Sequence, residues 1–276
     1  MMSDRHKLLT DSIKRLLRRN AMSNLRKIVN KTHAADLAFV FPSLPISSQP
    51  KLLGMIKDVG KKGTLFSELN EDTLRYLFEN MALEEIVEVL EQMATDDVAD
   101  IIGRLPDEMA NAIFDKMKQE GLEQIEGLLR YGDETAGGIM VPDFIALKED
   151  MTAREAIASL QTEYSDVEMP FYLYVVDEYG RLVGVSSLRQ LVLVAPETPL
   201  KELMSTDVFF VTTDMDQEEV AKLVARYDIL AVPVVDSMHK LVGIVTVDDV
   251  IDIFREEATE DILKMAGAGG ELVETK

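Results

Sequence analysis

An internal repeat dominates the second half of the chain and leaves few folds open to it. Val176–Leu188 recurs as Val235–Val247, 59 residues later, with a Val-Asp pair, a polar turn and a Leu-Val-Gly run. Upstream, Ile139-Met140 corresponds to Leu203-Met204 at an offset of 64, so the first copy holds about five additional residues near Ser165–Phe171. Each copy reads as strand, helix, strand, hairpin turn, strand, helix. Copies this small lack a core of their own, so we expect them to pack face to face.

The second copy ends in a helix with an acidic face. Its apolar residues recur every three or four positions, which predicts that they face inward: Val250, Ile251, Phe254 and Ala258. Four acids recur at the same spacing and share another face: Asp249, Asp252, Glu256 and Glu260. Like charges at this spacing cost a helix a few tenths of a kcal/mol per pair. A bound divalent cation would offset that cost, and an ordinary solvated acidic face is the alternative.

The first half of the chain reads as a series of helices. Residues 1–40 are predicted as helix, and residues 41–50 form a loop rich in Pro and Ser. Short helices follow to about Arg130, with Asn70 and Thr95 as expected N-caps and Pro106 in a first turn. Helices this short are unstable alone, so they are expected to stack as a superhelical α-domain.

Composition excludes several functions. A formal net charge of −21 disfavours nucleic acid and anionic membranes as partners. The chain has no Cys, which excludes disulfides, thiolate metal sites and Cys nucleophiles. It has no phosphate-binding loop and no nucleophile elbow, so we do not expect an enzyme. Residues 1–31 are the exception in charge, with nine Lys/Arg against two Asp. This start is either a solvated helix, a helix lying on the acidic body, or a contact to anionic lipid.

Several motifs resemble known families. A Gly-apolar-x-Ser/Thr element directly after the hairpin is typical of CBS domains. The chain has a similar element in each copy, at Gly184–Ser187 and Gly243–Thr246. Thr135–Met140 (TAGGIM), Thr246–Val250 (TVDDV) and Glu256–Asp261 (EEATED) are more specific and resemble the MgtE magnesium transporters. The cytosolic half of that family is a superhelical N domain followed by two CBS domains, an order that covers nearly the whole chain.

The resemblance implies a multidomain α + α/β fold, with an all-α superhelical N-terminal domain followed by a tandem CBS pair of β-α-β-β-α repeats. The expected domains are an N domain over residues 1–130 with a basic helical lead over 1–31, CBS domains over 131–197 and 198–257, and an acidic linker or tail over 258–276. The implied function is cytosolic Mg²⁺ sensing: the ion bridges acids of different domains and holds a closed state.

The metal ligands implied by the resemblance are all carboxylates: Asp96, Asp100, Asp216, Asp228, Asp249, Asp252, Glu257, Glu260 and Asp261. Mg²⁺ takes oxygen ligands and keeps several waters, so one or two carboxylates per ion suffice. Ca²⁺ or Mn²⁺ would satisfy the same oxygens. Ordinary roles compete at some positions. Asp96 also suits a first helical turn and Asp216 suits a helix cap, whereas Asp228 precedes an apolar strand and has less local reason to be charged.

Two alternatives belong to other classes. CBS pairs often hold an adenine nucleotide such as ATP, and the matching positions here are Tyr172, Ser187, Gln190 and Thr246. Gln190 stands where an Asp would contact the ribose, so it offers no charged acceptor. The other alternative is an interaction scaffold without a ligand.

The expected partners follow from the family. They are a second copy bound through the CBS domains and a transmembrane pore, in cis if the sequence belongs to a longer chain or in trans if it stands alone. No apolar run reaches the roughly 18 residues that a membrane span needs. The chain as given is therefore expected in the cytoplasm, or at the cytoplasmic face of the inner membrane within a full-length transporter.

Overall fold

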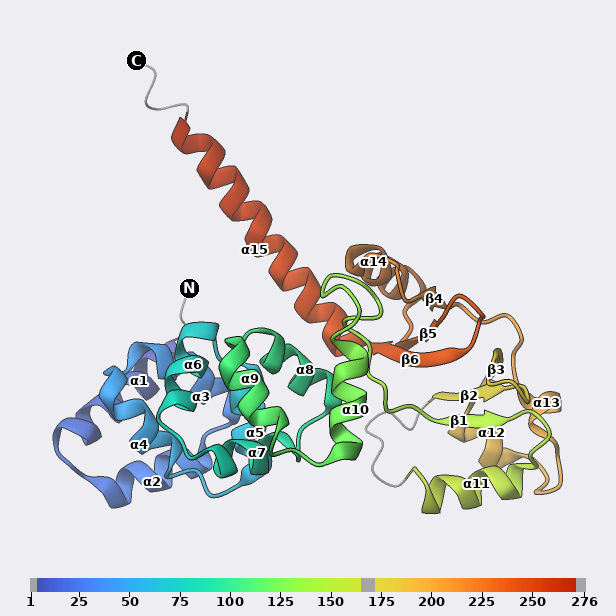
Figure 1. Cartoon of the computed structure of the whole chain (residues 1–276), viewed down its shortest axis with the longest axis horizontal. Helices are drawn as coiled ribbons and strands as arrows, with labels where there is room; N and C mark the ends of the chain where they lie inside the picture. The colour runs from blue at the N-terminus through green and yellow to red at the C-terminus, as the bar shows by residue number, and fades with distance from the viewer. Residues whose placement is uncertain (1–3, 165–171, 272–276) are drawn as a thin grey trace. The chain divides into compact units, whose positions relative to one another are not determined.

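The computed structural model describes residues 4–164 and 172–271, with the side chains of the last helix described at most positions as far as Lys264. The additional residues predicted in the first copy, near 165–171, lie outside this range. The chain divides into two compact units, Met1–Glu126 and Gly127–Lys276. Each unit is described by itself (Figure 1).

Unit 1 is helical, as the sequence predicts. Its odd-numbered helices pack on one another in succession, α1 on α3, α3 on α5, α5 on α7 and α7 on α9. Most of the buried side chains of unit 1 are apolar, and Phe66 of α5 meets Phe78 of α6 edge to face at a centroid distance of 5.1 Å. The helices are α1 (Asp4–Arg18), α2 (Met22–Lys31), α3 (Ala34–Val40), α4 (Gln49–Leu53), α5 (Val59–Ser67), α6 (Glu71–Glu79), α7 (Leu83–Leu90), α8 (Thr95–Gly103), α9 (Asp107–Phe114) and α10 (Gln119–Leu128), with 3₁₀ turns η1 (Phe41–Ser43) and η2 (Ile46–Ser48).

Local signals set the ends of these helices. Residues 1–40 form three helices instead of one, because Asn20 takes a left-handed φ of 51° after α1 and His33 caps α3 by accepting from the backbone N–H of Ala35. Asn70 caps α6, as predicted. The prediction for Thr95 is wrong, since Ala94 is the N-cap of α8 and Thr95 is its first residue. Pro106 is the N-cap of α9, one position before the predicted first turn.

Unit 2 holds the two repeats in the predicted order of elements. Each copy forms a three-stranded sheet with one parallel and one antiparallel pair, and both sheets have a register shift at the same place, Val175/Val176 and Val234/Val235. The first copy comprises β1 (Ala146–Lys148), α11 (Ala153–Thr162), β2 (Tyr172–Val176), β3 (Leu182–Ser187) and α12 (Leu188–Leu193). The second comprises α13 (Leu200–Leu203), β4 (Val211–Thr212), α14 (Gln217–Tyr227), β5 (Ala231–Val235), β6 (Leu241–Thr246) and α15 (Val247–Glu271).

Short lead segments, residues 139–141 and 203–205, exchange between the two copies. Val141 pairs with Ile244 on β6 through two backbone hydrogen bonds of 2.7 and 3.0 Å, and Ser205 pairs with Val185 on β3 at 2.8 and 2.9 Å. Each lead segment thus precedes one copy and extends the sheet of the other. The methionine of each lead lies against the glycine of the partner sheet, Met140 on Gly243 and Met204 on Gly184.

The hairpin tips meet in the same reciprocal way. The backbone N–H of Leu182 donates to the carbonyl of His239 at 3.2 Å, and that of Leu241 donates to the carbonyl of Gly180 at 3.1 Å. Gly180 and His239 occupy the same repeat position and both have a positive φ, of 79° and 65°. These paired contacts give unit 2 a pseudo-twofold arrangement, so the copies pack against each other as predicted.

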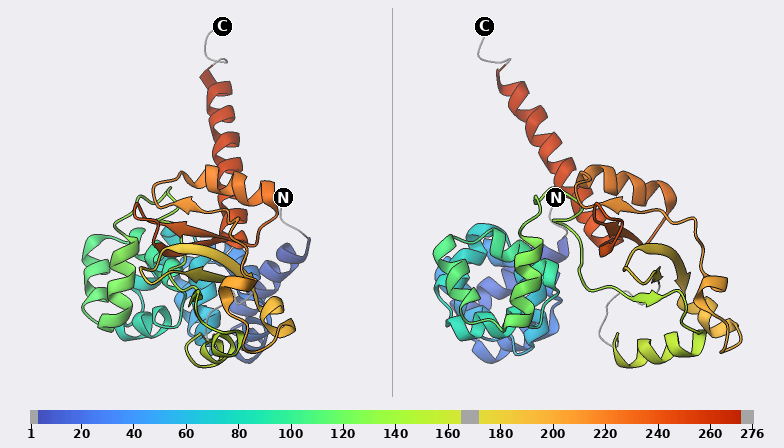
Figure 2. Two further views of the ribbon diagram at one scale, coloured as in Figure 1. Left: turned by 90° about the vertical axis from the view of Figure 1, so that its right-hand side faces the viewer. Right: turned by 45° about the vertical axis from the view of Figure 1, so that its right-hand side comes forward.

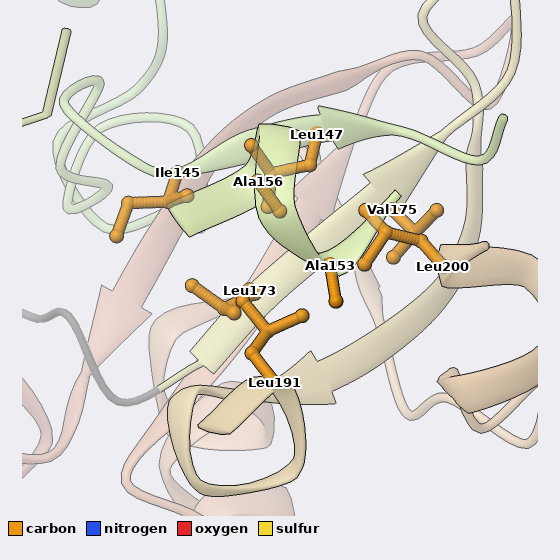
Figure 3. Close-up of a cluster of buried hydrophobic side chains, with 8 residues drawn as sticks. All are labelled: Ile145, Leu147, Ala153, Ala156, Leu173, Val175, Leu191 and Leu200. Carbon is orange, nitrogen blue, oxygen red and sulfur yellow. The ribbon is translucent and has the colours of Figure 1, made fainter. Parts of the chain in front are cut away.

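Two apolar clusters hold unit 2 together. The first lies between α11, α12 and the sheet of copy one and includes Leu200 from α13 of the second copy; its residues are Ile145, Leu147, Ala153, Ala156, Leu173, Val175, Leu191 and Leu200 (Figure 3). The second joins the copies: Tyr174 and Leu182 of one pack with Val235, Leu241 and other residues of the second. The Tyr174 hydroxyl donates to the carbonyl of Ala231 at 3.3 Å within this interface.

Helix α15 packs only through its first part, against α14 and β6, and then extends beyond them as a single helix (Figure 2). The predicted inward face is therefore largely wrong. Val250 and Ile253 are buried, whereas Ile251 and Phe254 are 46% and 44% exposed and Ala258 is exposed. Apolar residues do recur every three or four positions along α15. Among the described residues, however, Val250 and Ile253 lie on the covered side of the helix, and Ile251 and Phe254 lie on the exposed side.

Candidate functional site

The Thr-Ala-Gly-Gly motif positions the start of α14. The backbone N–H groups of Ala136 and Gly137 donate to the carbonyls of Met215 and Thr213 at 2.7 and 2.9 Å, and that of Gln217 donates to the carbonyl of Glu134 at 2.9 Å. Only glycine fits at Gly138, where an added Cβ would lie 2.3 Å from the carbonyl oxygen of Gly132. The motif therefore holds the acidic segment that opens α14 in place.

Asp216 caps that helix. Its Oδ1 atom accepts the backbone N–H of Glu218 at 2.9 Å, so the capping role considered from sequence is present. The side chain is exposed, and its second carboxylate oxygen remains on the outside of the cap. One carboxylate can serve as a cap and contribute an oxygen to a hydrated cation.

Two further carboxyl groups meet where α14 packs on α15. Glu218, in the first turn of α14, and Glu257, on α15, lie close enough for their carboxyl groups to interact. The pKa of Glu218 is held below its ordinary value, first by the hydrogen bond and charge of Lys222, at 2.6 Å, and then by the contact with Glu257 and the charge of Lys264. Two carboxyl groups that approach each other in this way repel when both are ionised, and a cation bound between them would offset that repulsion.

Asp228 has a local structural role that the sequence did not reveal. It is the C-cap of α14 with φ 51° and ψ 40°, and its backbone N–H donates to the carbonyl of Val224. Left-handed backbone is strained for most side chains and tolerated by Asp and Asn. This backbone gives a local reason for Asp or Asn at the position, but it does not require a charge, so the metal role predicted for Asp228 stays a prediction; the side chain is exposed just before β5.

The acids of α15 fall into different environments. Asp249 Oδ2 accepts both the backbone N–H, at 3.2 Å, and the hydroxyl of Thr246, so it belongs to the cap of α15. Asp252 is mostly exposed and forms an ion pair with Arg255 at 2.7 Å. Glu260 and Asp261 lie in the same helix, and their side chains are outside the described residues.

The acidic pair of unit 1 lies one helical turn apart on α8. Asp96 is half-buried, with its Oδ1 atom shielded from solvent, and Asp100 is exposed. Asp96 and Asp97 occupy the first turn of α8, where negative charge is favourable. Asp96 therefore also suits the helix-stabilising role that the sequence offered as the alternative to metal binding.

Three of the four predicted nucleotide positions, Tyr172, Ser187 and Gln190, lie together at the end of β3. Tyr172 pairs across the sheet with Ser187, and Ser187 and Gln190 form a capping box for α12: the amide oxygen of Gln190 accepts the backbone N–H of Ser187 at 2.9 Å, while Ser187 Oγ accepts that of Gln190 at 3.2 Å. Thr246 and Asp249 stand at the equivalent positions of the second copy. Gln190 thus replaces the acid as a cap without losing the hydrogen bond.

No group of three or more His, Asp or Glu side chains that could hold a metal forms among the described residues. The structure brings Asp216, Glu218 and Glu257 to the α14–α15 region, and Asp96 and Asp100 to unit 1. Glu218 was missed as a site residue, and its only signal was its place two residues after Asp216. Across residues 4–164 and 172–271, no helix combines the length and apolar composition that crossing a membrane requires.

Comparison with known families matches both parts of the chain. Residues 32–134 match the MgtE intracellular N domain, and residues 136–197 and 200–256 each match a CBS domain. The matching models describe an MgtE domain and CBS domains, and neither is a catalytic domain; an enzyme relative, the inosine-5'-monophosphate dehydrogenase of Methanocaldococcus jannaschii, is similar over only 48% of this chain.

Curated relatives give the same result. The chain is 37% identical over 261 residues to the magnesium transporter MgtE of Thermus thermophilus and 31% identical over 257 residues to that of Bacillus subtilis, in both cases over 93% of its own length. It spans 58% and 57% of those relatives. The structure is similar to the crystal structure of the cytosolic domain of the Mg²⁺ channel MgtE in complex with ATP, with a TM-score of 0.81 and 35% identity over 88% of this chain and 99% of that one.

Proposed function

The chain belongs to the MgtE family of magnesium transporters, and from this premise we propose that it is the Mg²⁺-sensing regulatory part of such a transporter. In this proposal Mg²⁺ binds between carboxylates of different elements and domains and favours a closed arrangement. The ion shifts the population because it binds the closed state more tightly than the open one. The site would act at the cytoplasmic face of the membrane, beside a transmembrane pore.

The contact between Glu218 and Glu257 carries this proposal. Glu218 lies two residues after the exposed cap Asp216 and interacts with Glu257 at the junction of α14 and α15. Mg²⁺ bound between these carboxylates would offset the repulsion between two ionised groups. The donors fit the ion, since Mg²⁺ accepts one or two carboxylates and completes its shell with water. Asp252, on the exposed side of α15, would add a further oxygen once its ion pair with Arg255 opens.

The remaining predicted ligands take part as proposals of the same kind. Asp96 and Asp100 would supply the acids of unit 1, and Asp228, Glu260 and Asp261 would complete the acidic set of unit 2. We propose the same domain limits for the regulatory part as the sequence predicts: 1–130, 131–197, 198–257 and 258–276.

A second copy would bind through the CBS domains, as supported by the exposed apolar side chains of α12, Val192 and Leu193.

The test is Mg²⁺ titration calorimetry on the chain and on Glu218→Gln/Glu257→Gln. The double variant removes both carboxylates but keeps their size, so we expect the affinity for Mg²⁺ to fall about tenfold or more. Without Mg²⁺ it should be at least as stable as the parent, because the like charges are gone. Glu178→Gln/Glu202→Gln is the matched control, with the same change in charge at exposed positions of the same unit. Equal Mg²⁺ affinity in parent and double variant would refute the site.

Adenine-nucleotide binding in the CBS pair is the second candidate. It is supported by the grouping of Tyr172, Ser187 and Gln190 and by the similarity to a domain crystallised with ATP. A nucleotide would have to replace the cap hydrogen bonds of Gln190, which carries no charge to hold a ribose. ATP titration without Mg²⁺ separates the candidates: binding that Gln190→Ala abolishes would support this one, and no response to either ligand would leave a scaffold.

A further inference from the structure

A basic cavity of about 580 Å³ lies in unit 1, between the end of α1 and the η2–α4 segment. Three cationic side chains line it: Lys14 and Arg18 from α1, and Lys51 from α4. Lys14 and Arg18 are four residues apart on one face of α1. No acidic side chain lines the cavity.

These three cations form no ion pair in the part of the chain that the structure describes. Lys14 is half-buried, and Arg18 uses its Nε–H on the carbonyl of Lys14 at 3.4 Å, which leaves its terminal N–H groups for other acceptors. Lys14 and Arg18 belong to the basic first 31 residues, and Lys51 brings a further positive charge to the same place from a later helix. Together the three cations generate a local positive field that attracts anions.

The rest of the lining matches a phosphate ester. Ser47, Ser48 and Asn20 supply hydroxyl and amide donors next to the cations. Leu17, Met22 and Pro45 supply an apolar wall, which an inorganic ion alone would not need. The volume is within the range of small-molecule sites, which combine apolar walls with a few polar groups.

We propose that this cavity binds an organic phosphate, with its phosphate held by Lys14, Arg18 and Lys51 and its apolar part against Leu17 and Met22. The chemistry is shared by two sources, a free phosphate ester and the headgroup of an anionic phospholipid. Both offer several anionic oxygens to a guanidinium and two ammonium groups. The proposal is independent of Mg²⁺ sensing, because it uses none of the acidic residues.

The test uses the whole chain and two kinds of probe. Calorimetry at low salt measures the binding of hexyl phosphate and inorganic phosphate, and sedimentation measures binding to phosphatidylcholine vesicles with and without 30% phosphatidylglycerol. We expect one hexyl phosphate per chain, bound more tightly than inorganic phosphate, or selective binding to the anionic vesicles. The first result assigns a free ester and the second a lipid headgroup.

Variants test whether the cavity is the place where hexyl phosphate or the anionic vesicles bind. Lys14→Ala/Arg18→Ala/Lys51→Ala should weaken binding about tenfold or more. Lys7→Ala/Arg26→Ala/Lys31→Ala removes the same charge from exposed positions outside the cavity and should retain the affinity within about twofold. If the first triple variant does not fold by circular dichroism, Lys51→Glu, at an exposed position, replaces it. Equal losses in both triples, or no binding of any probe by the parent, would overturn the proposal.

Discussion

Among the described glycines, Gly138 has the least room for a side chain. An added Cβ would lie 2.3 Å from the carbonyl oxygen of Gly132 and 3.1 Å from the Cα of Asp133, both backbone atoms that cannot rotate away. We expect Gly138→Ala to lower the free energy of unfolding by about 2 kcal/mol or more, as overpacking does. Urea unfolding followed by circular dichroism measures it.

Gly127→Ala is the control for that substitution. No atom lies within 4 Å of a Cβ at this helical position, so alanine should be neutral or should stabilise by about 0.5–1 kcal/mol. Equal effects at both glycines would show that backbone crowding is not the reason for the glycine in the motif.

Substitutions at Asp228 can distinguish a structural role of this residue from a role as a Mg²⁺ ligand. Its left-handed backbone favours glycine, so Asp228→Gly should raise the free energy of unfolding by up to about 1 kcal/mol, and Asp228→Ala should lower it. If the carboxylate also binds Mg²⁺, Asp228→Gly should at the same time reduce the stabilisation by MgCl₂. Thermal unfolding with and without the ion measures both. An unchanged response to Mg²⁺ would leave Asp228 as a cap alone.

Residue types and their spacing predicted part of the candidate site. Asp216 was identified as a helix cap from its place before α14, and the structure confirms it. The C-cap role of Asp228 was not predicted, because it depends on left-handed backbone angles that the residue type alone does not reveal. Glu218 was missed because its contact with Glu257 joins two helices about 40 residues apart, and no local pattern marks such a contact.

At the scale of elements, the start of α15 combines a cap with a proposed ligand. Thr246 donates to Asp249 from its backbone and its hydroxyl. Asp249→Ala should cost about 1 kcal/mol of stability, as cap losses do. Asp249→Asn keeps an acceptor and should cost less, yet it removes the charge. Both variants should weaken the Mg²⁺ response, measured by thermal unfolding. A full Mg²⁺ response in Asp249→Asn would exclude the carboxylate from the site.

The order of elements in unit 2 was predictable because the repeat displays each pattern twice. The exchange of the lead segments was not, since Val141 pairs with Ile244, about 100 residues away, and hydrophobic periodicity carries no information on such partners. The inward face of α15 was assigned from the spacing of its apolar residues. In the structure Val250 and Ile253 are buried, whereas Ile251 and Phe254 in the same turns are exposed, so the covered face of the helix differs from the one that periodicity indicates.

At the scale of the molecule, the proposed second copy can be tested on α12. Val192 and Leu193 are 68% and 73% exposed and form an apolar surface beside the more covered Leu188. We expect the chain of 30.9 kDa to have about twice that mass by light scattering. Val192→Glu/Leu193→Glu should return it to the mass of one chain, because charges oppose an apolar interface. Glu178→Gln/Glu202→Gln should leave the mass unchanged. A parent of single-chain mass would refute the dimer.

The most direct test of Mg²⁺ sensing is the thermal unfolding midpoint of the chain measured against increasing MgCl₂, with NaCl at matched ionic strength. A ligand that binds only the folded state adds RT ln(1 + [L]/Kd) to its stability, about 1.4 kcal/mol at ten times Kd. For a chain of this size we expect a rise of about 2–4 °C beyond that in NaCl. An identical rise in both salts would mean that screening of the acidic surface explains the effect, and it would contradict the proposed function.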